Sequence, residues 1–160
     1  MRFEKVSCEQ YTKDIGSDID LSKEYDDIKL PKRATSGSAG YDFFSPCSFT
    51  LEQGETIKIP TGIRAIIDSD KVLAIYPRSG LGFKYRVQLD NTVGIIDSDY
   101  SNAKNEGHIM IKITNDGREG KAVEIKKGEA FAQGIIQQFF TTEDDEADGV
   151  RTGGFGSTTK

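Results

Sequence analysis

The sequence contains few of the residues from which metal sites and nucleophilic triads are usually built. Its 160 residues include one histidine, His108, and two cysteines, Cys8 and Cys47. A Ser-His-Asp triad would have to use His108, which lies in a strand-like polar position and is expected to be a hydrogen-bonded or surface residue. The cysteines have neither metal-ligand spacing nor the density of a disulfide framework, so we expect a reducing, cytoplasmic location. One disulfide between them stays an open alternative.

Long hydrophobic runs and a surplus of basic residues are also absent. No apolar run approaches the ~20 residues that span a bilayer, and the first residues, MRFEKVSCEQ, lack the apolar segment of a signal peptide. The net charge of -5 argues against a broad nucleic-acid-binding surface, although a few arginines can still form a small anion site. We therefore expect neither a membrane nor a nucleic acid as a partner.

What the sequence does contain is hydrophobic alternation with a period of two. Ile57 and Ile59, and Val123 with Ile125, alternate with polar residues. Ile109, Ile111 and Ile113 alternate with Met110, Lys112 and Thr114, and glycine-containing turns separate these runs. Helical spacing is weak and limited to residues 17–28 and a short turn near LGFKYR. Many short strands with regular turns predict an all-β sandwich, barrel or jelly roll.

Composition divides the chain into four parts. Residues 1–27 are polar and acidic, and we expect a surface extension of unknown role; residues 28–140 carry the strands of one β-domain. Residues 141–149, TTEDDEADG, are an acidic run typical of a solvated linker, which would make residues 150–160 a mobile C-terminal arm.

Glycine, hydroxyl, arginine and carboxylate residues gather in a few short segments. After the strand KVLAIY, Pro77 ends the ladder, and Arg78, Ser79 and the N–H of Gly80 can converge on an anion. The tail GGFGSTTK is no P-loop, because its lysine ends the chain instead of opening a helix. The segments are SAGYDFF (38–44), YPRSGLG (76–82), DNTVGIIDSDY (90–100), GEAFAQGII (128–136) and RTGGFGST (151–158).

In order and approximate spacing, these segments resemble the five motifs of the trimeric deoxyuridine triphosphate nucleotidohydrolases, the dUTPases, over residues 29–158. The resemblance implies a jelly-roll-like fold and hydrolysis of dUTP to dUMP and pyrophosphate by water attack on the α-phosphorus. It also implies a homotrimer with sites at the subunit interfaces, and a C-terminal arm that reaches a neighbouring subunit. Such an enzyme limits uracil incorporation into DNA and supplies dUMP for thymidylate synthesis.

The resemblance assigns roles at the phosphates. Asp97 matches the general base that orients and deprotonates the water, a task for which a carboxylate is suited. Arg78, Ser79 and Gly80 match the phosphate-binding motif, and Gln133 matches a contact to a phosphate or to a metal-bound water. Mg²⁺ would be held mainly by triphosphate oxygens and waters, with Asp42 reaching it through one water.

The resemblance also assigns roles at the nucleoside. The segment RVQLDNTVGIID is predicted to be a strand-turn-strand hairpin whose backbone pairs with uracil. Asn91, Gly94 and Met110 are implied uracil contacts, and Tyr100 packs beneath the deoxyribose, where a 2′-hydroxyl would clash. A core tyrosine at the end of a hairpin is the alternative for Tyr100.

The arm supplies the remaining contacts. Arg151 resembles the contact to the γ-phosphate and Phe155 the ring that stacks on uracil, while the glycines, Gly156 among them, permit close backbone approach. Ser157 and Thr158 add hydroxyls for the terminal phosphate, so the arm is expected to act as a lid.

The chain departs from the family pattern in two places. The segment SNAKNEGH (101–108) is an insertion beside the base pocket, in front of Met110. In the arm, Arg151 precedes GGFG by one residue fewer than is usual, and Thr159 stands at the final glycine.

Alternative functions remain open from the sequence. A dCTP deaminase of the same fold would need a glutamate in the strand HIMIKITN, which contains no acidic residue. A non-catalytic dUTP sensor would have little use for a carboxylate at Asp97. An enzyme that also acts as a regulatory binder would use residues 1–27 or the 101–108 insertion.

Overall fold

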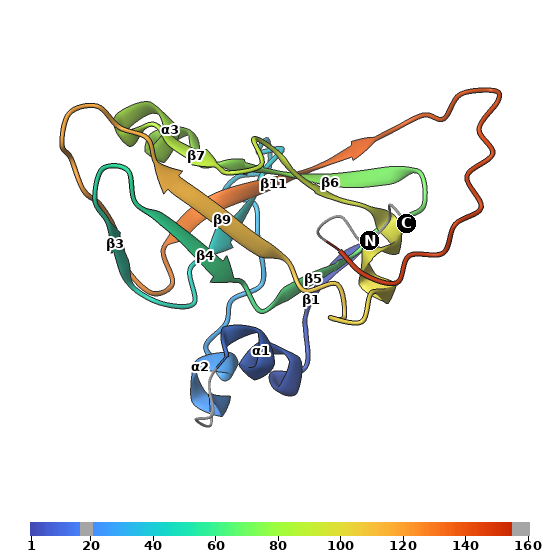
Figure 1. The fold of residues 1–160 in the computed structure, drawn as a ribbon, viewed down its shortest axis with the longest axis horizontal. Coiled ribbons are helices and arrows are strands. Elements are labelled where there is room, and N and C mark those ends of the chain that lie inside the picture. Colours follow the sequence, from blue (N-terminus) through green and yellow to red (C-terminus); the bar gives the residue numbers. More distant parts are fainter. Residues whose placement is uncertain (17–20, 155–160) are drawn as a thin grey trace.

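The computed structural model of the chain describes residues 1–16 and 21–154 and shows a molecule built mainly of short strands (Figure 1). The helices are α1 (Cys8–Ile15), α2 (Ser22–Asp26), α3 (Ser79–Tyr85) and the 3₁₀ helix η1 (Ser98–Asn102). The strands are β1 (Arg2–Lys5), β2 (Tyr41–Phe44), β3 (Phe49–Leu51), β4 (Thr56–Pro60), β5 (Ile63–Ile66), β6 (Lys71–Pro77), β7 (Val87–Leu89), β8 (Gly94–Ile96), β9 (Met110–Asn115), β10 (Val123–Ile125) and β11 (Ala130–Gln138).

The strands form small sheets that are packed face to face around one hydrophobic core. Two sheets carry the candidate site: a four-stranded sheet with the order β2-β11-β6-β8 and a three-stranded sheet with the order β4-β9-β7. The pairs β1-β5 and β10-β3 complete the described strands. All pairings are antiparallel, which confirms the predicted all-β, jelly-roll-like class.

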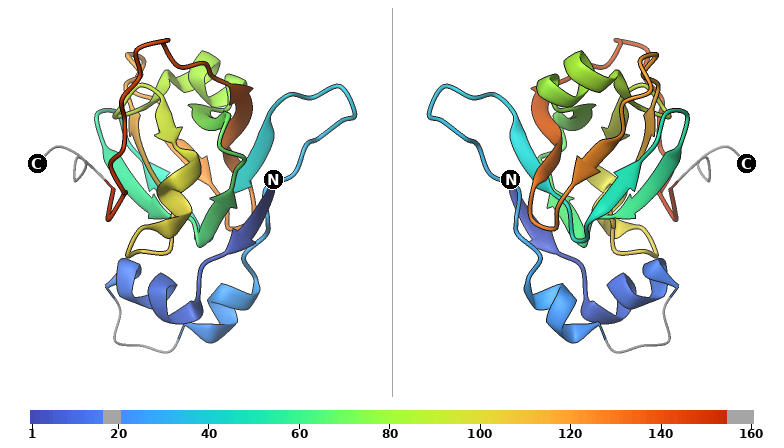
Figure 2. Two further views of the ribbon diagram at one scale, coloured as in Figure 1. Left: turned by 90° about the vertical axis from the view of Figure 1, so that its right-hand side faces the viewer. Right: turned by 90° about the vertical axis from the view of Figure 1, so that its left-hand side faces the viewer.

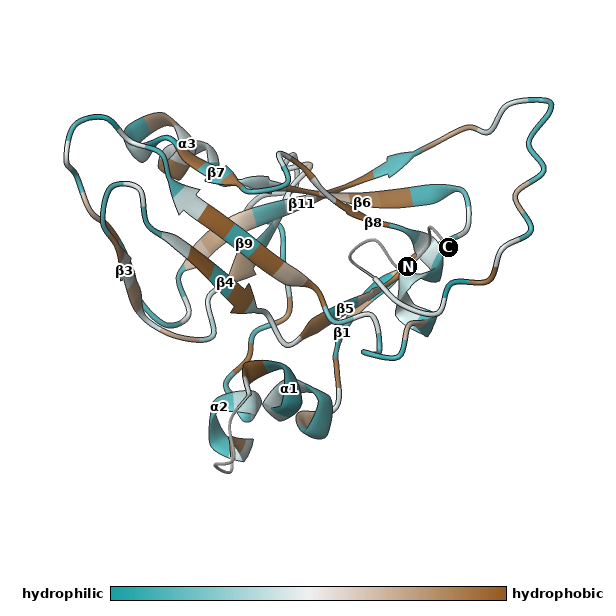
Figure 3. Cartoon of the chain, viewed as in Figure 1, coloured by the Kyte–Doolittle hydropathy of each residue, from teal (hydrophilic) through white to brown (hydrophobic). Residues whose placement is uncertain are grey.

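The period-two alternation predicts which side chains are buried. In the pairing of β4 with β9, Ile59 lies opposite Ile111 and Ile57 opposite Ile113. Ile59, Ile111 and Ile113 are buried, whereas the intervening lysines face outward. Figure 3 shows the resulting bands of hydrophobic residues along β4, β6 and β9. Alternation thus places one face of each strand in the core.

The N-terminal segment is part of the domain and not only a cover on its surface. β1 pairs with β5, and Val6 and Tyr11 are buried in the core. The expectation of a surface extension is therefore wrong at these positions, because each buried apolar side chain adds to the hydrophobic stabilisation of the fold. Figure 2 shows α1 and α2 together at one end of the β structure.

Local sequence signals explain α1. The Ser7 hydroxyl accepts a hydrogen bond from the N–H of Gln10, and Gly16 ends the helix with a φ of 72°. These are an N-cap and a left-handed C-cap. Of the predicted helical region 17–28, α2 occupies residues 22–26, while residues 17–20 lie outside the described part. The predicted turn near LGFKYR is contained in α3.

One predicted pairing is wrong. β7 and β8 are separated by a short turn, as expected, but they do not form a hairpin: β7 pairs with β9, and β8 pairs with β6. Thr92, with a φ of 65°, turns the chain from one sheet to the other. Gly94 makes this possible, because a Cβ at that position would lie only 3.1 Å from the Cβ of Ile75 on β6.

Beyond β11, residues 141–150 are exposed and contain no helix or strand. Cys8 and Cys47 are both free, so no disulfide joins them. Within residues 1–16 and 21–154, no helix has the length and apolar character needed to cross a bilayer.

Candidate active site

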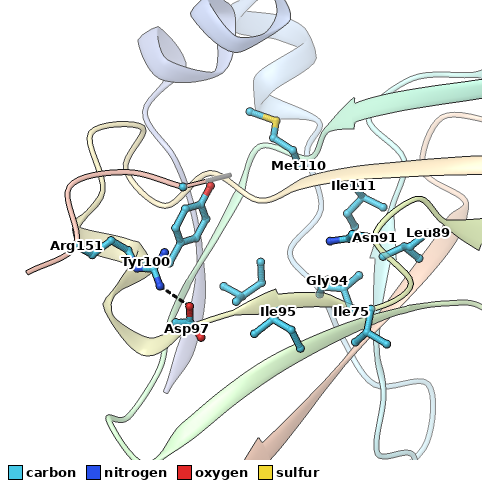
Figure 4. Close-up of a pocket in the computed structure, with 13 residues that line it drawn as sticks. Ile75, Leu89, Asn91, Gly94, Ile95, Asp97, Tyr100, Met110, Ile111 and Arg151 are labelled. Atoms are coloured by element: carbon cyan, nitrogen blue, oxygen red, sulfur yellow. Dashed lines mark hydrogen bonds and ion pairs between the residues drawn. The ribbon is translucent and has the colours of Figure 1, made fainter. Parts of the chain in front are cut away.

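A pocket of about 270 Å³ opens between β8 and the start of β9 (Figure 4). Apolar side chains form most of its walls, and a few polar groups converge on it, which is the usual composition of a small-molecule site. It is lined by Ile75, Leu89, Asn91, Val93, Gly94, Ile95, Ile96, Asp97, Tyr100, Met110, Ile111, Arg151 and Gly154.

The backbone of the pocket comes from two strands at sheet edges. β8 is the last strand of its four-stranded sheet, and β7 is the last strand of its three-stranded sheet. Each therefore has one edge that pairs with no described strand and can offer N–H and C=O groups to a planar ligand. Asn91 lies in the turn between these strands, and Met110 closes the pocket from β9.

Asp97 and Tyr100 are placed by η1. Asp97 is the residue before the helix, with 48% of its side chain exposed, and Tyr100 lies inside it and is buried. The Tyr100 hydroxyl donates to the carbonyl of His108 at 3.0 Å and accepts from Nδ2 of Asn105 at 2.9 Å. Burial raises the pKa of Tyr100, so its hydroxyl stays protonated.

Arg151 brings the arm onto this carboxylate. Its Nη2 forms an ion pair with Asp97, and its Nε donates to Oδ1 of Asp99 at 2.6 Å. The guanidinium also lies 5.9 Å from the centre of the Tyr100 ring, within cation–π range. Burial opposes the charge of Arg151, but the hydrogen bond and charge of Asp99, together with those of Asp97, outweigh it and raise the pKa of Arg151.

Gly154 lets the arm lie flat on the pocket wall. A Cβ at this position would come within 2.7 Å of Cε2 of Tyr100, closer than real Cβ atoms approach other atoms. Only glycine permits this contact without a shift of the arm or the ring. Residues 151–154 thus lie over the pocket of their own chain.

A second polar cluster lies on the same sheet. Gln133 of β11 stands between Asp42 of β2 and Tyr76 of β6 in the strand register. Because cross-strand partners point to the same face, Asp42 and Gln133 lie side by side, and Arg78 joins them from the end of β6. The Nε of Arg78 lies 3.2 Å from Oδ1 of Asp42, and Nε2 of Gln133 donates to the carbonyl of Pro77 at 3.1 Å.

Ser79 and Gly80 form the exposed first turn of α3, directly after Arg78. The first N–H groups of a helix have no intrahelical acceptor, so they remain available to an anion together with the Ser79 hydroxyl. Arg78 is 44% exposed in its side chain and can turn towards the same anion.

Known proteins of one family match most of the chain. The family model described as dUTPase matches residues 26–159. The chain belongs to the dUTPase family. It is similar to the deoxyuridine 5′-triphosphate nucleotidohydrolase of Lactococcus lactis subsp. lactis, with 42% identity over 134 residues, which cover 82% of this chain and 88% of the relative. It is also 46% identical over 141 residues to the deoxyuridine 5′-triphosphate nucleotidohydrolase of Hahella chejuensis, and the match covers 82% of this chain and 88% of that relative.

Solved structures of dUTPases share the fold. The dUTPase of Streptococcus mutans superposes with a TM-score of 0.67 at 29% identity and covers 89% of this chain and 99% of its own. The dUTPase of Staphylococcus bacteriophage 80alpha with dUPNHPP has a TM-score of 0.62 at 26% identity, covering 82% and 92%. At 23% identity, a mutant dUTPase of phage phi11 of S. aureus, whose structure describes the coordination of a structural Mg(II) ion, shows the fold alone, with a TM-score of 0.61 and coverage of 77% and 92%.

In this dUTPase chain the predicted site residues fall into two groups. The nucleoside group consists of Asn91, Gly94, Asp97, Tyr100, Met110 and Arg151, which line one pocket. The phosphate group consists of Asp42, Arg78, Ser79, Gly80 and Gln133. Phe155, Gly156, Ser157 and Thr158 lie outside the described residues.

The two groups lie at opposite ends of β6. Ile96 pairs with Leu73, so Asp97 follows opposite Val72, whereas Arg78 follows Pro77 at the other end of the strand. Six residues at ~3.3 Å each separate the two positions by roughly 20 Å. Figure 1 shows the same arrangement, with α3 on one side of the molecule and the arm on the other. A single chain therefore does not bring Asp97 to its own Arg78, Ser79 and Gly80.

Sequence reasoning missed several residues that shape the pocket. Asp99 is the second partner of Arg151, and its place two residues after Asp97, in a short polar helix, was the available signal. Asn105 was assigned no role within the insertion, yet it holds the Tyr100 hydroxyl. His108 is hydrogen-bonded, as expected, but it is buried and not a surface residue.

Proposed function

We propose that this dUTPase hydrolyses dUTP with Asp97 as the general base. The residues that bind the phosphates are supplied by a neighbouring copy of the chain. The activity itself follows from membership of the family: dUTP and water give dUMP and pyrophosphate. Its consequence is less uracil in DNA and a supply of dUMP for thymidylate synthesis. The observation that carries the residue assignments is the half-exposed Asp97 carboxylate at the edge of the apolar pocket.

Asp97 is suited to activate water. A carboxylate with an exposed oxygen can accept a hydrogen bond from a water and take its proton as the water oxygen bonds to the α-phosphorus. The bond from that phosphorus to the pyrophosphate leaving group breaks, and the leaving group departs on the opposite side. Without substrate, the ion pair with Arg151 occupies this carboxylate.

Arg151 changes partners when the triphosphate binds. Its guanidinium is held by Asp97 and Asp99, and the terminal phosphate is a stronger competitor because it offers several charged oxygens. Transfer of Arg151 to the γ-phosphate frees Asp97 to act on water. The arm thus couples substrate binding to release of the base.

Uracil is bound by backbone groups at the edges of β8 and β7. The unpaired edge of β8 presents N–H and C=O groups to the pyrimidine edge in the way that a further strand would be recognised. Asn91, Gly94 and Met110 bound this space. Tyr100 forms the wall beneath the deoxyribose and excludes a 2′-hydroxyl.

The phosphates are bound by the second group on an adjacent subunit. Arg78, Ser79 and Gly80 supply positive charge and hydrogen-bond donors, which stabilise the charge that develops at the α-phosphate. Gln133 contacts a phosphate oxygen or a metal-bound water. The separation of this group from Asp97 within one chain is the reason to infer sites at subunit interfaces, and the family resemblance implies that the assembly is a homotrimer.

Exposed apolar residues support this assembly. Phe139, Phe140 and Val150 flank the acidic segment 141–149 and have exposed side chains. Such residues at both ends of a solvated linker suit a segment that packs against another subunit. The linker would place residues 150–160 at the pocket of a neighbouring subunit. There Phe155 would stack on uracil, Gly156 would allow close approach, and Ser157 and Thr158 would contact the terminal phosphate.

The donor set fits Mg²⁺ bound through water. Among the described residues, no three His, Cys, Asp or Glu side chains form a cluster that could enclose a metal ion. Mg²⁺ keeps several waters and takes phosphate oxygens, so a single carboxylate such as Asp42, beside the amide of Gln133, suffices to hold a metal-bound water. When bound, the ion neutralises charge on the triphosphate oxygens.

The free cysteines, Cys8 and Cys47, suit a reducing compartment, and we place the enzyme in the cytoplasm.

Pyrophosphate release with Mg²⁺ from dUTP, dCTP, dTTP and UTP tests the proposal, with the Asp97→Asn variant alongside. We expect release from dUTP alone and a loss of at least a hundredfold in the variant, because the base is removed while the side-chain shape is kept. Equal turnover by Asp97→Asn would refute the base assignment. Binding of dUTP without hydrolysis would indicate a sensor, and ammonia from dCTP would indicate a deaminase.

A further inference from the structure

The 101–108 insertion holds the hydroxyl of Tyr100 from two sides. Tyr100 Oη donates to the backbone carbonyl of His108, and Asn105 Nδ2 donates to Tyr100 Oη. The second bond comes from a side chain that lies wholly within the insertion. With both bonds made, the far end of the aromatic ring is fixed where it lines the pocket.

The insertion is itself fastened to the N-terminal segment. Glu106 adopts a φ of 59°, which is uncommon for a residue with a side chain, and its carboxylate accepts from the N–H and Oγ of Ser7 at 2.7 and 2.6 Å. At Gly107, with a φ of 73°, a Cβ would lie 2.7 Å from the Cα of Ser101. The loop therefore has one compact path, which is fixed at the N-cap of α1.

His108 adds a buried anchor. Its Nε2 accepts from the N–H of Gly62 at 2.7 Å, so the neutral ring carries its proton on Nδ1 and donates it to Oδ2 of Asp14 at 2.6 Å. Gln10 also donates to Oδ2 of Asp14, at 2.7 Å. The His108–Asp14 bond connects α1 to the residue whose carbonyl holds Tyr100, and the Gln10 bond fixes the Asp14 carboxylate within α1.

We propose that α1 and the 101–108 insertion form a positioning device for Tyr100, in which Asn105 is the specificity-determining residue. The inference rests on the proposed function, in which Tyr100 forms the wall beneath the deoxyribose. An aromatic side chain excludes one extra hydroxyl only if it cannot move aside. Hydrogen bonds that fix this side chain supply the required rigidity. Asn105 thus sets how strongly the enzyme prefers dUTP over UTP.

The test is the ratio of kcat/KM for dUTP to kcat/KM for UTP in Asn105→Ala. We expect this ratio to fall about tenfold, the scale of one lost hydrogen bond, mainly through better use of UTP, while the melting temperature changes little. Asn102→Ala is the matched control, because Asn102 is an exposed asparagine of the same loop and makes none of these bonds. Its ratio should equal that of the wild type.

A double-mutant cycle with Tyr100→Phe separates positioning from general stability. Tyr100→Phe keeps the ring and removes both bonds, so it should lower the ratio by itself, and adding Asn105→Ala should lower it no further. If Asn105→Ala does not fold, Tyr100→Phe carries the test alone. An unchanged ratio in Tyr100→Phe, or equal and independent effects of the two changes, would overturn the inference.

Failure of the proposed function has a different signature. If the wild-type enzyme hydrolyses dUTP and UTP equally, then Tyr100 does not exclude the 2′-hydroxyl, and this part of the proposed function is wrong. If the wild type discriminates and Tyr100→Ala does not, while Asn105→Ala discriminates as well as the wild type, then the wall stands and its positioning by Asn105 is refuted.

Discussion

The nucleoside group and the phosphate group differ in how completely one chain builds them. Around Tyr100, side chains are bonded to one another and two of them are largely buried: Tyr100 is 6% exposed and the Arg151 side chain 16%, while Asp97 keeps 48% of its side chain exposed. Around Arg78, whose side chain is 44% exposed, the first turn of α3 faces outward. In the proposed function, the chain completes the part of the site that must have a fixed shape and leaves open the part that binds phosphates together with another subunit.

Mixed trimers give the sharpest test of this comparison. Asp97→Asn and Arg78→Ala subunits should each be inactive alone, because each lacks one group of the site. When the two are coexpressed, sites that combine the intact Arg78 of one chain with the intact Asp97 of its neighbour should form, and about a quarter of the wild-type activity should return. Pyrophosphate release by the purified mixture measures this recovery.

A control mixture and a check of subunit exchange are needed to interpret the activity of the mixed trimers. Mixing Asp97→Asn subunits with Asp97→Asn/Arg78→Ala subunits should restore nothing. If the first mixture also stays inactive while its subunits are shown to exchange, both groups serve the same chain, and the inferred division of the site between copies is wrong.

Arg151 pairs with Asp97 and Asp99 beside the pocket, and its removal should have the next largest effect. Arg151→Ala removes the partner of Asp97 in the free enzyme and the proposed contact to the γ-phosphate in the complex, so kcat/KM for dUTP should fall on the order of a hundredfold or more. Asp99→Asn is the matched control, since it weakens only the resting ion pair.

The Asp99→Asn control also predicts the direction of change in kcat and KM. Asp99→Asn should keep kcat and leave KM equal or lower, because the arm is held less tightly to its own chain. A loss in Asp99→Asn as large as that in Arg151→Ala would mean that the ion pair itself, and not its exchange for phosphate, supports catalysis.

Gly154 tests how closely the arm must approach. Gly154→Ala places a methyl group 2.7 Å from the present position of Tyr100 Cε2, and overpacking of this kind costs ~1–3 kcal/mol. In the proposed function the arm makes the same close approach to Tyr100 of the pocket that it serves, so we expect KM for dUTP to rise about tenfold with little change in melting temperature. Gly149→Ala, where no atom lies within 4 Å of the added Cβ, should match the wild type in a titration of initial rate against dUTP. Equal KM values in the two variants would contradict the contact.

The sequence predicts the strands well because their signal is local. Alternation at Ile57 and Ile59 places the same residues in the core that the structure buries or half-buries. The pairing of β7 with β9, and of β8 with β6, is not local: it depends on which surfaces Leu89 and Gly94 meet across the molecule. The turn residues therefore predict a hairpin, but in the structure the two strands beside the turn pair with other strands.

The N-terminal segment shows the same limit for a helix. Ser7, three residues before Gln10, and Gly16 are recognisable capping signals, but between them the polar face of α1 gives weak periodicity. Burial of Tyr11 and the bond from Asp14 to His108 depend on a loop nearly a hundred residues later. For the site, motifs could predict the residue types, while their division into two distant groups depends on the length of β6.

The smallest expected effect is the pH dependence of the region around Tyr100. Burial of His108 lowers its pKa below the ordinary value of 6.5, although Asp14 and Glu106 favour its charged form. The Tyr11 ring of α1 also packs near it, at 6.1 Å between ring centres. As the pH falls below about 6.5, His108 binds a proton in the unfolded chain but not yet in the folded chain. The free energy of unfolding therefore decreases until the pH has passed the pKa of His108 in the folded state.

Because His108 is the single histidine of the sequence, this loss can be assigned. Urea unfolding from pH 7.5 to 5.5 should show a falling midpoint in the wild type and a flatter profile in His108→Gln, which does not titrate there. Hydrogen exchange distinguishes the two groups: backbone amides of 101–109 should lose protection as the pH falls, after correction for the intrinsic exchange rate, and those of α3 should not. Equal losses in both places would mean that the histidine acts on the whole fold, and a flat wild-type profile would mean that its burial has no net effect on stability.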